Sequence, residues 1–220
     1  MLNQLSNELP SISSLLKPLR AEVNQEITCR LNLLNYKANN VFGVSDGNYS
    51  VYSLSGQSSV SNPYIFDLVF ISDSFIQVED IVDTDVKIIL EDKIDLRVSK
   101  TIFGKILKAS EHSVVAKKYL YTIKVVSPLY YLSLTNKYEI YHDKKVSDII
   151  LEIINRYKEL LNLNINIKID LLNEPIRDYT TQYDQSDLEF IQMLCEEEGY
   201  SLIIDYSSNN PYNITLCELN

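Results

Sequence analysis

The sequence predicts a mainly β protein of the α+β kind, in which an antiparallel β-barrel domain is followed by a small α+β domain. Two observations support this prediction. Between residues 41 and 126, short runs of β-branched and aromatic residues alternate at a period of two between turn signals, as in antiparallel barrels and sandwiches. Beyond residue 128 an amphipathic helical pattern replaces this alternation. We therefore expect an N-terminal extension over residues 1–38, the barrel over 39–127 and the α+β domain over 128–220.

The N-terminal extension has apolar residues at spacings of three and four, namely Leu2, Leu5, Leu9, Ile12, Leu16, Leu19 and Val23. Pro10 and Pro18 lie inside this stripe. Because proline interrupts a helix, short helices that begin near each proline are expected. We interpret the segment as a helical or irregular arm docked on the body. A coiled coil that binds a partner is the alternative, and residues 26–34, EITCRLNLL, could equally form a strand.

About seven runs make up the predicted barrel, separated by charged residues or by Asp-Gly and Asn-Pro turns. They are VFGVS (41–45), NYSVYSLS (48–55), YIFDLVFIS (64–72), DVKIILED (85–92), KIDLRVSK (93–100), FGKILKAS (103–110) and KKYLYTIKVV (117–126). Between the third and fourth runs, Gln77–Thr84 is expected to form a single helical turn that plugs one end of the barrel.

Ser127-Pro128 marks the boundary between the two domains, because proline cannot donate to a sheet ladder and holds its predecessor extended. The segment VSDIILEIINRYKELL (146–161) then has apolar residues on one helical face, and Glu152 is expected to pair with Arg156 on the other. Residues 163–171 alternate as a strand. YTTQY precedes a second helix, and YSLIIDY with YNITLCEL forms a closing hairpin.

Both ends of the second helix can be predicted from its sequence. Ser186 followed by Glu189 is a capping box, and Asp187 and Glu189 lie where the helix dipole favours negative charge. Gly199 suits the left-handed conformation that ends a helix. We therefore expect these residues to be structural, not catalytic.

Three glutamates, Glu196, Glu197 and Glu198, need another explanation, because carboxylates in the last helical turn oppose the dipole. The alternatives are a solvated face, a basic partner surface or a cation site. Neither His112 nor His142 lies nearby in the sequence to complete a metal site. We therefore favour a partner-facing role and expect no metal or other cofactor.

The composition argues against several classes of protein. The formal net charge is −10 and no more than two basic residues are adjacent, so binding of nucleic acid or of anionic membranes is not expected. No apolar run approaches the roughly 18 residues of a spanning helix, and no signal-peptide pattern is present. We expect a cytosolic protein without membrane insertion, with Cys29, Cys195 and Cys217 as reduced structural thiols.

One motif could indicate an enzyme. The segment GVSDG around Ser45 matches the GxSxG nucleophile elbow of serine hydrolases, which lies between a strand and a helix. Here a strand pattern follows, and Asp46-Gly47 is a standard signal for a two-residue hairpin turn. Two histidines also leave little acid–base chemistry near neutral pH. We therefore expect no enzyme, and a serine hydrolase is the weaker alternative.

Four blocks of sequence point to a family. They are SNPYIFDLVFIS (61–72), FGKI (103–106), VVSPLYYLSLTNKYEIYHDKKVSDII (125–150) and RDYTTQYDQSDLEFIQMLCEEEGY (177–200). Together they resemble the N-terminal region of the VgrG spike proteins of type VI secretion, which contractile-phage tail-hub proteins share. The last block is the most specific, with signature residues Gln182, Tyr183, Ser186, Asp187, Leu188, Glu189, Phe190 and Gly199.

The resemblance implies a tail-hub-like fold and a mechanical role at the base of a spike. The family's trimers place paired barrels against a hexameric tube on one side and carry a needle on the other. The implied partners are therefore further copies of the parent chain, a tube protein, a spike-tip protein and effectors. Assembly in the cytoplasm followed by injection with the spike is also implied. A phage or phage-like tail hub and an effector-binding module are the alternatives.

The sequence departs from the family's plan in two ways. It contains one barrel and one α+β unit, without a second barrel, OB-fold or needle, and it adds the extension over residues 1–38. We therefore expect a fragment of a longer protein or a trimmed relative. Because a closed ring needs all of its interfaces, the chain alone is expected to be monomeric or weakly associated, although the parent would be a trimer.

Overall fold

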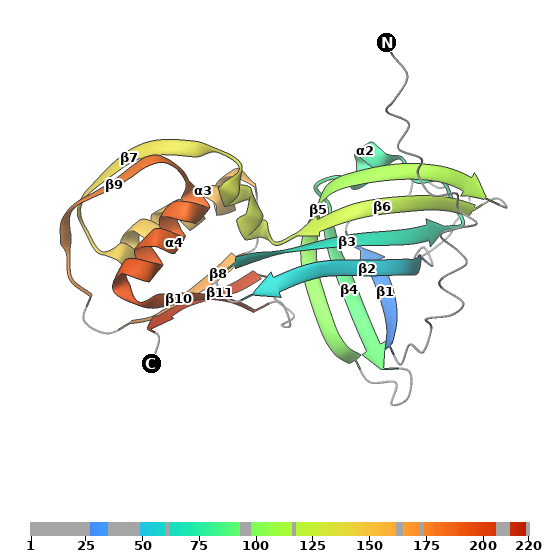
Figure 1. Cartoon of the computed structure of the whole chain (residues 1–220), viewed down its shortest axis with the longest axis horizontal. Helices are drawn as coiled ribbons and strands as arrows, with labels where there is room; N and C mark the ends of the chain where they lie inside the picture. The colour runs from blue at the N-terminus through green and yellow to red at the C-terminus, as the bar shows by residue number, and fades with distance from the viewer. Residues whose placement is uncertain are drawn as a thin grey trace, which may run out of the picture.

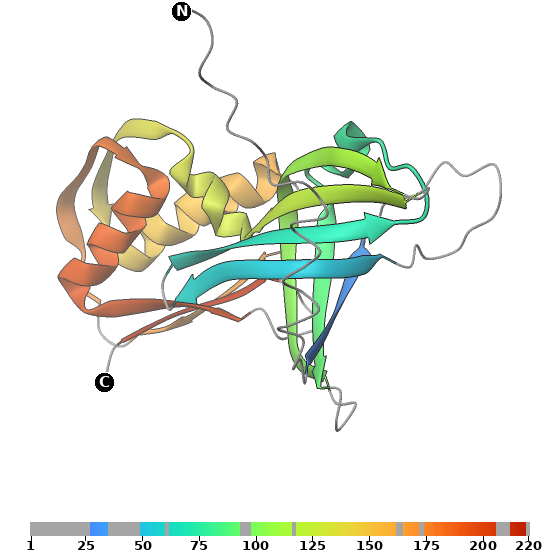
Figure 2. The ribbon, with the colours of Figure 1, turned by 45° about the vertical axis from the view of Figure 1, so that its right-hand side comes forward.

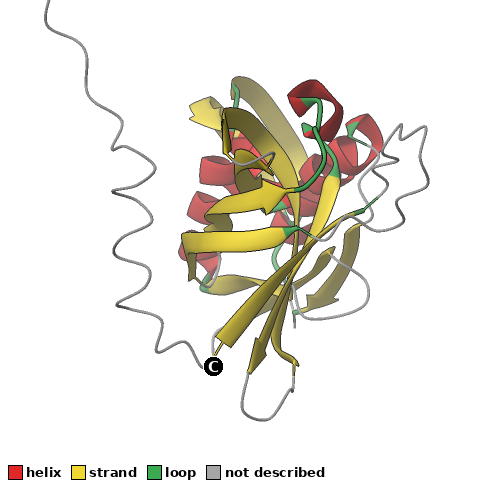
Figure 3. Cartoon of the chain, turned by 90° about the vertical axis from the view of Figure 1, so that its right-hand side faces the viewer, coloured by secondary structure: helices red, strands yellow, loops and turns green. Residues whose placement is uncertain are grey.

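A computed structural model describes residues 27–34, 49–59, 62–92, 98–115, 118–161, 165–171, 174–205 and 212–218. A β-barrel lies beside a smaller unit of helices and strands (Figure 1). In Figure 2 the shared end of β2 and β3 extends from the barrel toward that smaller unit. Seen from the barrel end, the two longer helices lie behind the strands (Figure 3).

Six antiparallel strands form a closed barrel in the order β1-β2-β3-β6-β5-β4. Their bounds are β1 Ile27–Leu33, β2 Ser50–Ser59, β3 Asn62–Ser72, β4 Asp85–Asp92, β5 Val98–Val115 and β6 Lys118–Val126. Strand β1 pairs with β4 along its whole length. Among the described residues it meets β2 only at the pair Arg30 and Ser50, so β4 is the main support of this strand.

The barrel begins earlier in the chain than the predicted boundary at residue 38. Strand β1 lies within the segment that we interpreted as an extension, and it closes the barrel between β2 and β4. Its residues alternate as in a barrel wall, since Leu31 is buried while Arg30 and Asn32 are exposed. The alternative interpretation of residues 26–34 as a strand is therefore confirmed, and their inclusion in the extension is wrong. Residues 1–26 and 35–38 of the predicted extension and the predicted strand at 41–45 lie outside the described residues.

A single long strand, β5, replaces the two strands predicted at 93–100 and 103–110, of which residues 93–97 are not described. At Gly104 the backbone of β5 lies very close to β6. A Cβ atom there would lie 2.6 Å from Val125 Cγ1 and 2.9 Å from the Val126 carbonyl oxygen. Glycine therefore allows β5 to pack tightly against β6 without a break.

Helix α2 (Val78–Ile81) closes one end of the barrel core, which confirms the predicted helical turn. Ile81 is fully buried, and the Ile76 amide donates to the Tyr121 hydroxyl at 2.8 Å. The Tyr121 ring stacks on Phe70 with centroids 5.3 Å apart. The core also contains Leu68, Val86, Ile88, Ile102, Ile106, Ile123 and Val125.

The α+β unit places two helices between two small sheets (Figure 1). After the 3₁₀ helix η1 (Pro128–Ser133), its elements are β7 Asn136–Lys144, α3 Val146–Leu160, β8 Ile165–Asp170, β9 Arg177–Ser186, α4 Asp187–Glu198, β10 Tyr200–Asp205 and β11 Tyr212–Glu218. Strands β7 and β9 form an antiparallel ribbon, and the other sheet has the order β10-β11-β8. The predicted helices and the antiparallel strand pair β10–β11 are confirmed, whereas the parallel pairing of β11 with β8 was not foreseen.

The predicted pair between Glu152 and Arg156 is wrong, because each residue has a partner on β7. The Arg156 guanidinium donates to both carboxylate oxygens of Glu139 at 2.7 and 2.9 Å, and Glu152 pairs with Lys144. Burial raises the pKa of Glu139, but hydrogen bonds from Arg156 and Tyr141 outweigh it and hold the pKa below its usual value. These ion pairs attach α3 to β7.

A network of charged and phenolic groups joins the two units. The ammonium group of Lys105, whose side chain is 9% exposed, donates to the Asp83 carbonyl oxygen at 2.8 Å and lies 3.7 Å from the Asp85 carboxylate. From the α+β unit, the Tyr131 hydroxyl donates to Asp83 at 3.0 Å and the Tyr212 hydroxyl to Asp85 at 3.1 Å. Burial and nearby carboxylates raise the pKa of both tyrosines, so both hydroxyls remain donors. We call these five residues the junction network.

Candidate interaction surfaces

Most signature residues predicted on β9 and α4 are buried inside the α+β unit. The Phe190 ring is fully buried and stacks on Tyr141 with centroids 5.8 Å apart. Buried members of the signature are Gln182, Ser186, Asp187, Leu188 and Phe190, each at most 8% exposed. Their packing attaches α4 to the β7–β9 ribbon, which is a structural role. Of the adjacent signature residues Gln182 and Tyr183 on β9, only Tyr183 points outward, and it is 75% exposed.

The capping box has the predicted geometry. The Glu189 amide donates to Ser186 Oγ at 3.2 Å, and the Ser186 amide donates to the Glu189 carboxylate at 2.9 Å. The hydrogen bonds that the Ser186 amide and hydroxyl donate to the carboxylate lower the pKa of Glu189. Gly199 ends the helix with a φ of 72°, in the left-handed region. The first and last turns of α4 therefore follow from the sequence alone.

Asp187 has a second role that the sequence did not reveal. Its carboxylate is fully buried, lies 2.6 Å from the Lys137 ammonium group and accepts a hydrogen bond from the Gln182 amide at 2.9 Å. The ammonium group also lies 5.2 Å from the centre of the Tyr157 ring. This buried ion pair connects the start of α4 to β7, fifty residues away in sequence.

The β7 strand turns its charged face inward. Lys137 and Glu139 point toward the helices, where Asp187 and Arg156 pair with them. Tyr138 and Ile140, on the opposite face, are 64% and 56% exposed. A strand usually buries its apolar alternate residues and exposes its polar ones. Here the arrangement is reversed, so hydrophobic burial within the unit does not explain the outer face.

The β9 strand has the same reversed arrangement. Thr180 and Gln182 are buried, and Thr180 Oγ1 and Gln182 Oε1 have no hydrogen-bond partner within the described part of the chain. Tyr179 and Tyr183 are 58% and 75% exposed. Because burying an unpaired polar atom costs free energy, this ribbon is not optimised for the isolated unit.

The outer residues of the ribbon form a continuous patch, which we call the aromatic face and define as Tyr138, Ile140, His142, Tyr179 and Tyr183. The rings of Tyr138 and Tyr183 meet edge to face at 5.2 Å, and those of His142 and Tyr179 lie 5.5 Å apart. Exposed apolar patches on soluble proteins commonly mark interaction sites, and tyrosine is enriched in protein interfaces. The aromatic face could not be predicted from the sequence, because alternation alone does not say which side of β7 faces the helices.

Two of the three predicted partner-facing glutamates have a partner within the chain. The Arg177 guanidinium donates to Glu197 at 2.8 Å and to Glu198 at 3.0 Å. Burial lowers the pKa of Arg177, but these hydrogen bonds outweigh it and raise the pKa above its usual value. Glu196 is exposed and forms no ion pair with any other described residue. It is therefore the one member of the three that stays a candidate for a basic partner.

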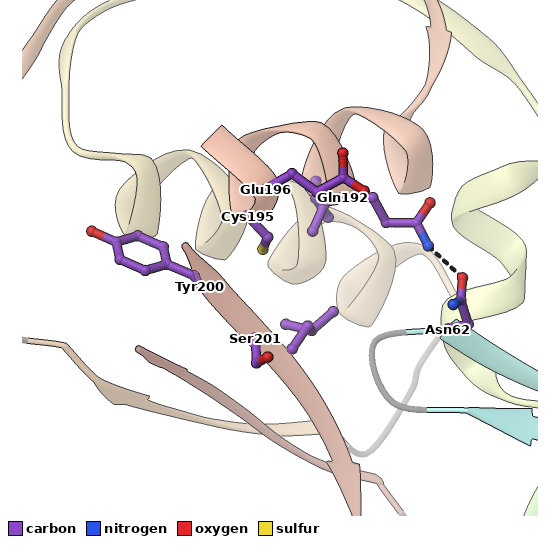
Figure 4. A pocket seen from close by; sticks show the side chains of 8 residues that line it. Asn62, Gln192, Cys195, Glu196, Tyr200 and Ser201 are labelled. Carbon is purple, nitrogen blue, oxygen red and sulfur yellow. Dashed lines mark hydrogen bonds between the residues drawn. The ribbon is translucent and has the colours of Figure 1, made fainter. Parts of the chain in front are cut away.

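Glu196 also lines a pocket of about 310 Å³ between α4, β10 and the start of β3 (Figure 4). The Gln192 amide donates to Asn62 Oδ1 at 2.7 Å across the two units. The lining residues are Asn62, Ile191, Gln192, Cys195, Glu196, Tyr200, Ser201 and Leu202. Burial, assisted by the Glu196 charge, raises the pKa of Cys195 to about 11, so this thiol is protonated at neutral pH and is a poor nucleophile.

The described residues contain no group of three or more His, Cys, Asp and Glu side chains that could hold a metal ion. His112 on β5 bonds to the Thr122 hydroxyl at 2.7 Å, and His142 belongs to the aromatic face. No helix in the described ranges is long and apolar enough to cross a membrane. Ser45 of the GxSxG motif lies outside these ranges.

Comparison with known proteins gives a family match. A family model described as the phage tail baseplate hub (GPD) matches residues 57–217. The chain is 25% identical over 163 residues to the type VI secretion system spike protein VgrG5 of Pseudomonas aeruginosa, covering 73% of this chain and 20% of that protein. VgrG4b of the same organism is 27% identical over 153 residues, covering 68% and 18%. The chain thus spans about a fifth of the length of these relatives.

Solved structures share the fold. The Escherichia coli c3393 protein, a type VI secretion component, has a TM-score of 0.69 at 18% identity, covering 86% of this chain and 49% of that one. A lidless Francisella PdpA–VgrG complex has a TM-score of 0.58 at 12% identity, covering 89% and 35%. A tail protein from Neisseria meningitidis MC58 has a TM-score of 0.53 at 8% identity, covering 87% and 50%.

Proposed function

We propose that this chain, which belongs to the phage tail baseplate hub (GPD) family, is a structural hub module at the base of the spike of a contractile injection machine. The observation that supports this best is the extent of the family match, from residue 57 in β2 to residue 217 in β11. That range includes most of the barrel, the junction network and the α+β unit. A role in assembly suits a molecule whose two units are joined by a network of polar contacts.

The machine that we favour is a type VI secretion system, because both curated relatives are spike proteins of that system. A phage or phage-like tail is the second candidate, because the tail protein from Neisseria has the same fold. In either machine the module would assemble in the cytoplasm and leave the cell with the spike.

The partners that we propose are further copies of the parent chain, a tube protein, a spike-tip protein and effectors. Supporting this, a VgrG protein forms a complex with PdpA in the Francisella structures. We propose a mechanical role without catalysis, since holding a tube and a spike requires contact surfaces and no reaction. The aromatic face and Glu196 are the candidate contact surfaces in the described part of the chain.

Deletion of the gene should abolish assembly. We expect the deletion strain to lose export of the tube protein, and we expect the full gene and a Ser45→Ala variant to restore it equally. Export is measured by immunoblotting of the tube protein in the culture supernatant. Wild-type export in the deletion strain would contradict the hub role, whereas failure of only the Ser45→Ala variant would favour the hydrolase. A variant without residues 1–26 tests the effector-binding alternative, which predicts loss of one effector alone.

Charge reversal at Glu196 should weaken assembly without unfolding the chain. Because Glu196 is exposed and makes no ion pair with other described residues, Glu196→Lys leaves intramolecular contacts unchanged but repels a basic partner. We expect export to fall about fivefold, the effect of losing roughly 1 kcal/mol of ion pairing. The matched control is Glu159→Lys, an exposed position on α3. Equal export from both variants would leave Glu196 as a solvated residue.

A further inference from the structure

We propose that the aromatic face docks a different protein, whose contact surface is apolar in the centre and carries Lys or Arg at its rim. This inference rests on the proposed function, because the partner would be another component of the same machine. It deepens that function by naming the surface and the chemistry of what covers it.

The reversed ribbon is the first observation that supports docking. Strands β7 and β9 bury Gln182 and turn Lys137 and Glu139, which are partly buried, toward the helices, and they leave three tyrosines and Ile140 more than half exposed. The inward charges require dedicated partners, and two inward polar atoms have none among the described residues. Exposing apolar side chains while burying polar ones is unfavourable for an isolated unit. Covering the outer face would remove its exposed apolar side chains from water and so offset part of this cost.

The charges at the rim of the face indicate the chemistry of the partner. Asp143, Asp178 and Asp184 are all exposed at the two ends of the ribbon, and a hydrogen bond to Asp184 raises the pKa of Tyr138. Of the neighbouring basic groups, Lys137, Lys144 and Arg177 already pair with Asp187, Glu152 and the Glu197–Glu198 pair, and Lys145 is partly buried at the start of α3. The rim therefore presents carboxylates, and a complementary surface is basic.

A second copy of this chain is a poor occupant for the same face. A two-fold contact brings each patch against itself, so aspartates would meet aspartates, and in the head-to-tail contact of a trimer the acidic rim would meet a chain whose formal net charge is −10. Nucleic acid is equally disfavoured, because the rim repels phosphates. A heterologous protein with basic residues around an apolar centre satisfies both the aromatic centre and the acidic rim.

Site-specific photocrosslinking in the full-length parent protein tests the proposal. A benzophenone amino acid at position 138, irradiated in cells that assemble the machine, should give an adduct with a protein other than the parent chain. The crosslinked peptide, identified by mass spectrometry, should carry Lys or Arg beside apolar residues. Asp178→Lys should reduce the adduct about fivefold. An adduct with a second copy, no adduct, or a yield unaffected by Asp178→Lys would overturn the proposal.

A pair of double variants separates this proposal from the hub role itself. Tyr138→Ser with Tyr183→Ser should reduce export at least about tenfold, with far-UV circular dichroism unchanged. The matched control is Ile169→Ser with Ile203→Ser, which removes exposed apolar side chains from the other sheet of the unit. If gene deletion abolishes export but the tyrosine variant does not, the docking proposal fails and the hub role stands. If gene deletion has no effect, the hub role fails.

Discussion

Replacing Lys137 by methionine should lower the free energy of unfolding by about 3–5 kcal/mol, the usual cost of leaving a buried charge without its partner. The Asp187 carboxylate is fully buried, and the Lys137 ammonium group at 2.6 Å is its only ion-pair partner among the described residues. Gln182 would still donate one hydrogen bond to it. Neutral donors do not compensate for a buried negative charge.

The measurement is urea unfolding followed by far-UV circular dichroism at 222 nm, because both long helices belong to the α+β unit that contains the pair. Lys144→Met is the matched control, since it removes the same charge from the half-exposed pair with Glu152. We expect that control to cost no more than about 1 kcal/mol. Adding Asp187→Asn to Lys137→Met should recover part of the lost stability, because it removes the stranded charge. Equal midpoints for the two methionine variants would show that the Lys137–Asp187 pair stabilises the fold no more than the half-exposed Lys144–Glu152 pair.

The local signals in the sequence were sufficient for most elements. Helix α3 follows from its apolar spacing, and α4 follows from Ser186, Glu189 and Gly199, because capping geometry depends on residues at most four positions apart. The central barrel strands follow from alternation. These features could be predicted because each depends on near neighbours in the chain.

The predictions that failed concern features that depend on contacts between residues distant in the sequence. The pairing of β1 with β4 joins residues about sixty positions apart, and it could not be inferred from a seven-residue alternation. Similarly, Arg156 matched Glu152 by helical spacing but pairs with Glu139 on β7. A local spacing rule gives the candidates for an ion pair, whereas the packed structure decides between them.

In the candidate site, strand β7 shows most clearly that a local sequence rule does not decide which face is buried. Its sequence offers an aromatic face with Tyr138 and Ile140 and a charged face with Lys137 and Glu139. Hydrophobic patterning alone would bury the aromatic face. The structure turns the charged face toward the helices, because Asp187 and Arg156 lie there and pair with Lys137 and Glu139. Departures of this kind from the local rule are expected at functional surfaces.

Replacing Lys105 by methionine should loosen the connection between the barrel and the α+β unit. Its ammonium group is the cation that neutralises Asp83 and Asp85 beneath the two tyrosine hydroxyls of the junction network. Because Asp83 and Asp85 are partly exposed, water would screen the remaining charges, and we expect a loss of about 2 kcal/mol instead of the larger cost at Asp187. The single unfolding transition should separate into two, one for each unit.

Urea unfolding followed by far-UV circular dichroism and by chemical labelling of the Cys29 thiol distinguishes the two transitions, because the long helices belong to the α+β unit and Cys29 lies in strand β1 of the barrel. Lys124→Met, which removes a surface pair with Asp67 at 2.9 Å, is the matched control. Tyr212→Phe removes one hydroxyl of the network and should cost about 1 kcal/mol. Coincident transitions in Lys105→Met, with a midpoint equal to that of Lys124→Met, would mean that apolar packing alone orients the units. Separate transitions would instead make the junction network the element that holds the barrel and the α+β unit of a hub module in a fixed relative orientation, and export should then fall although both units remain folded.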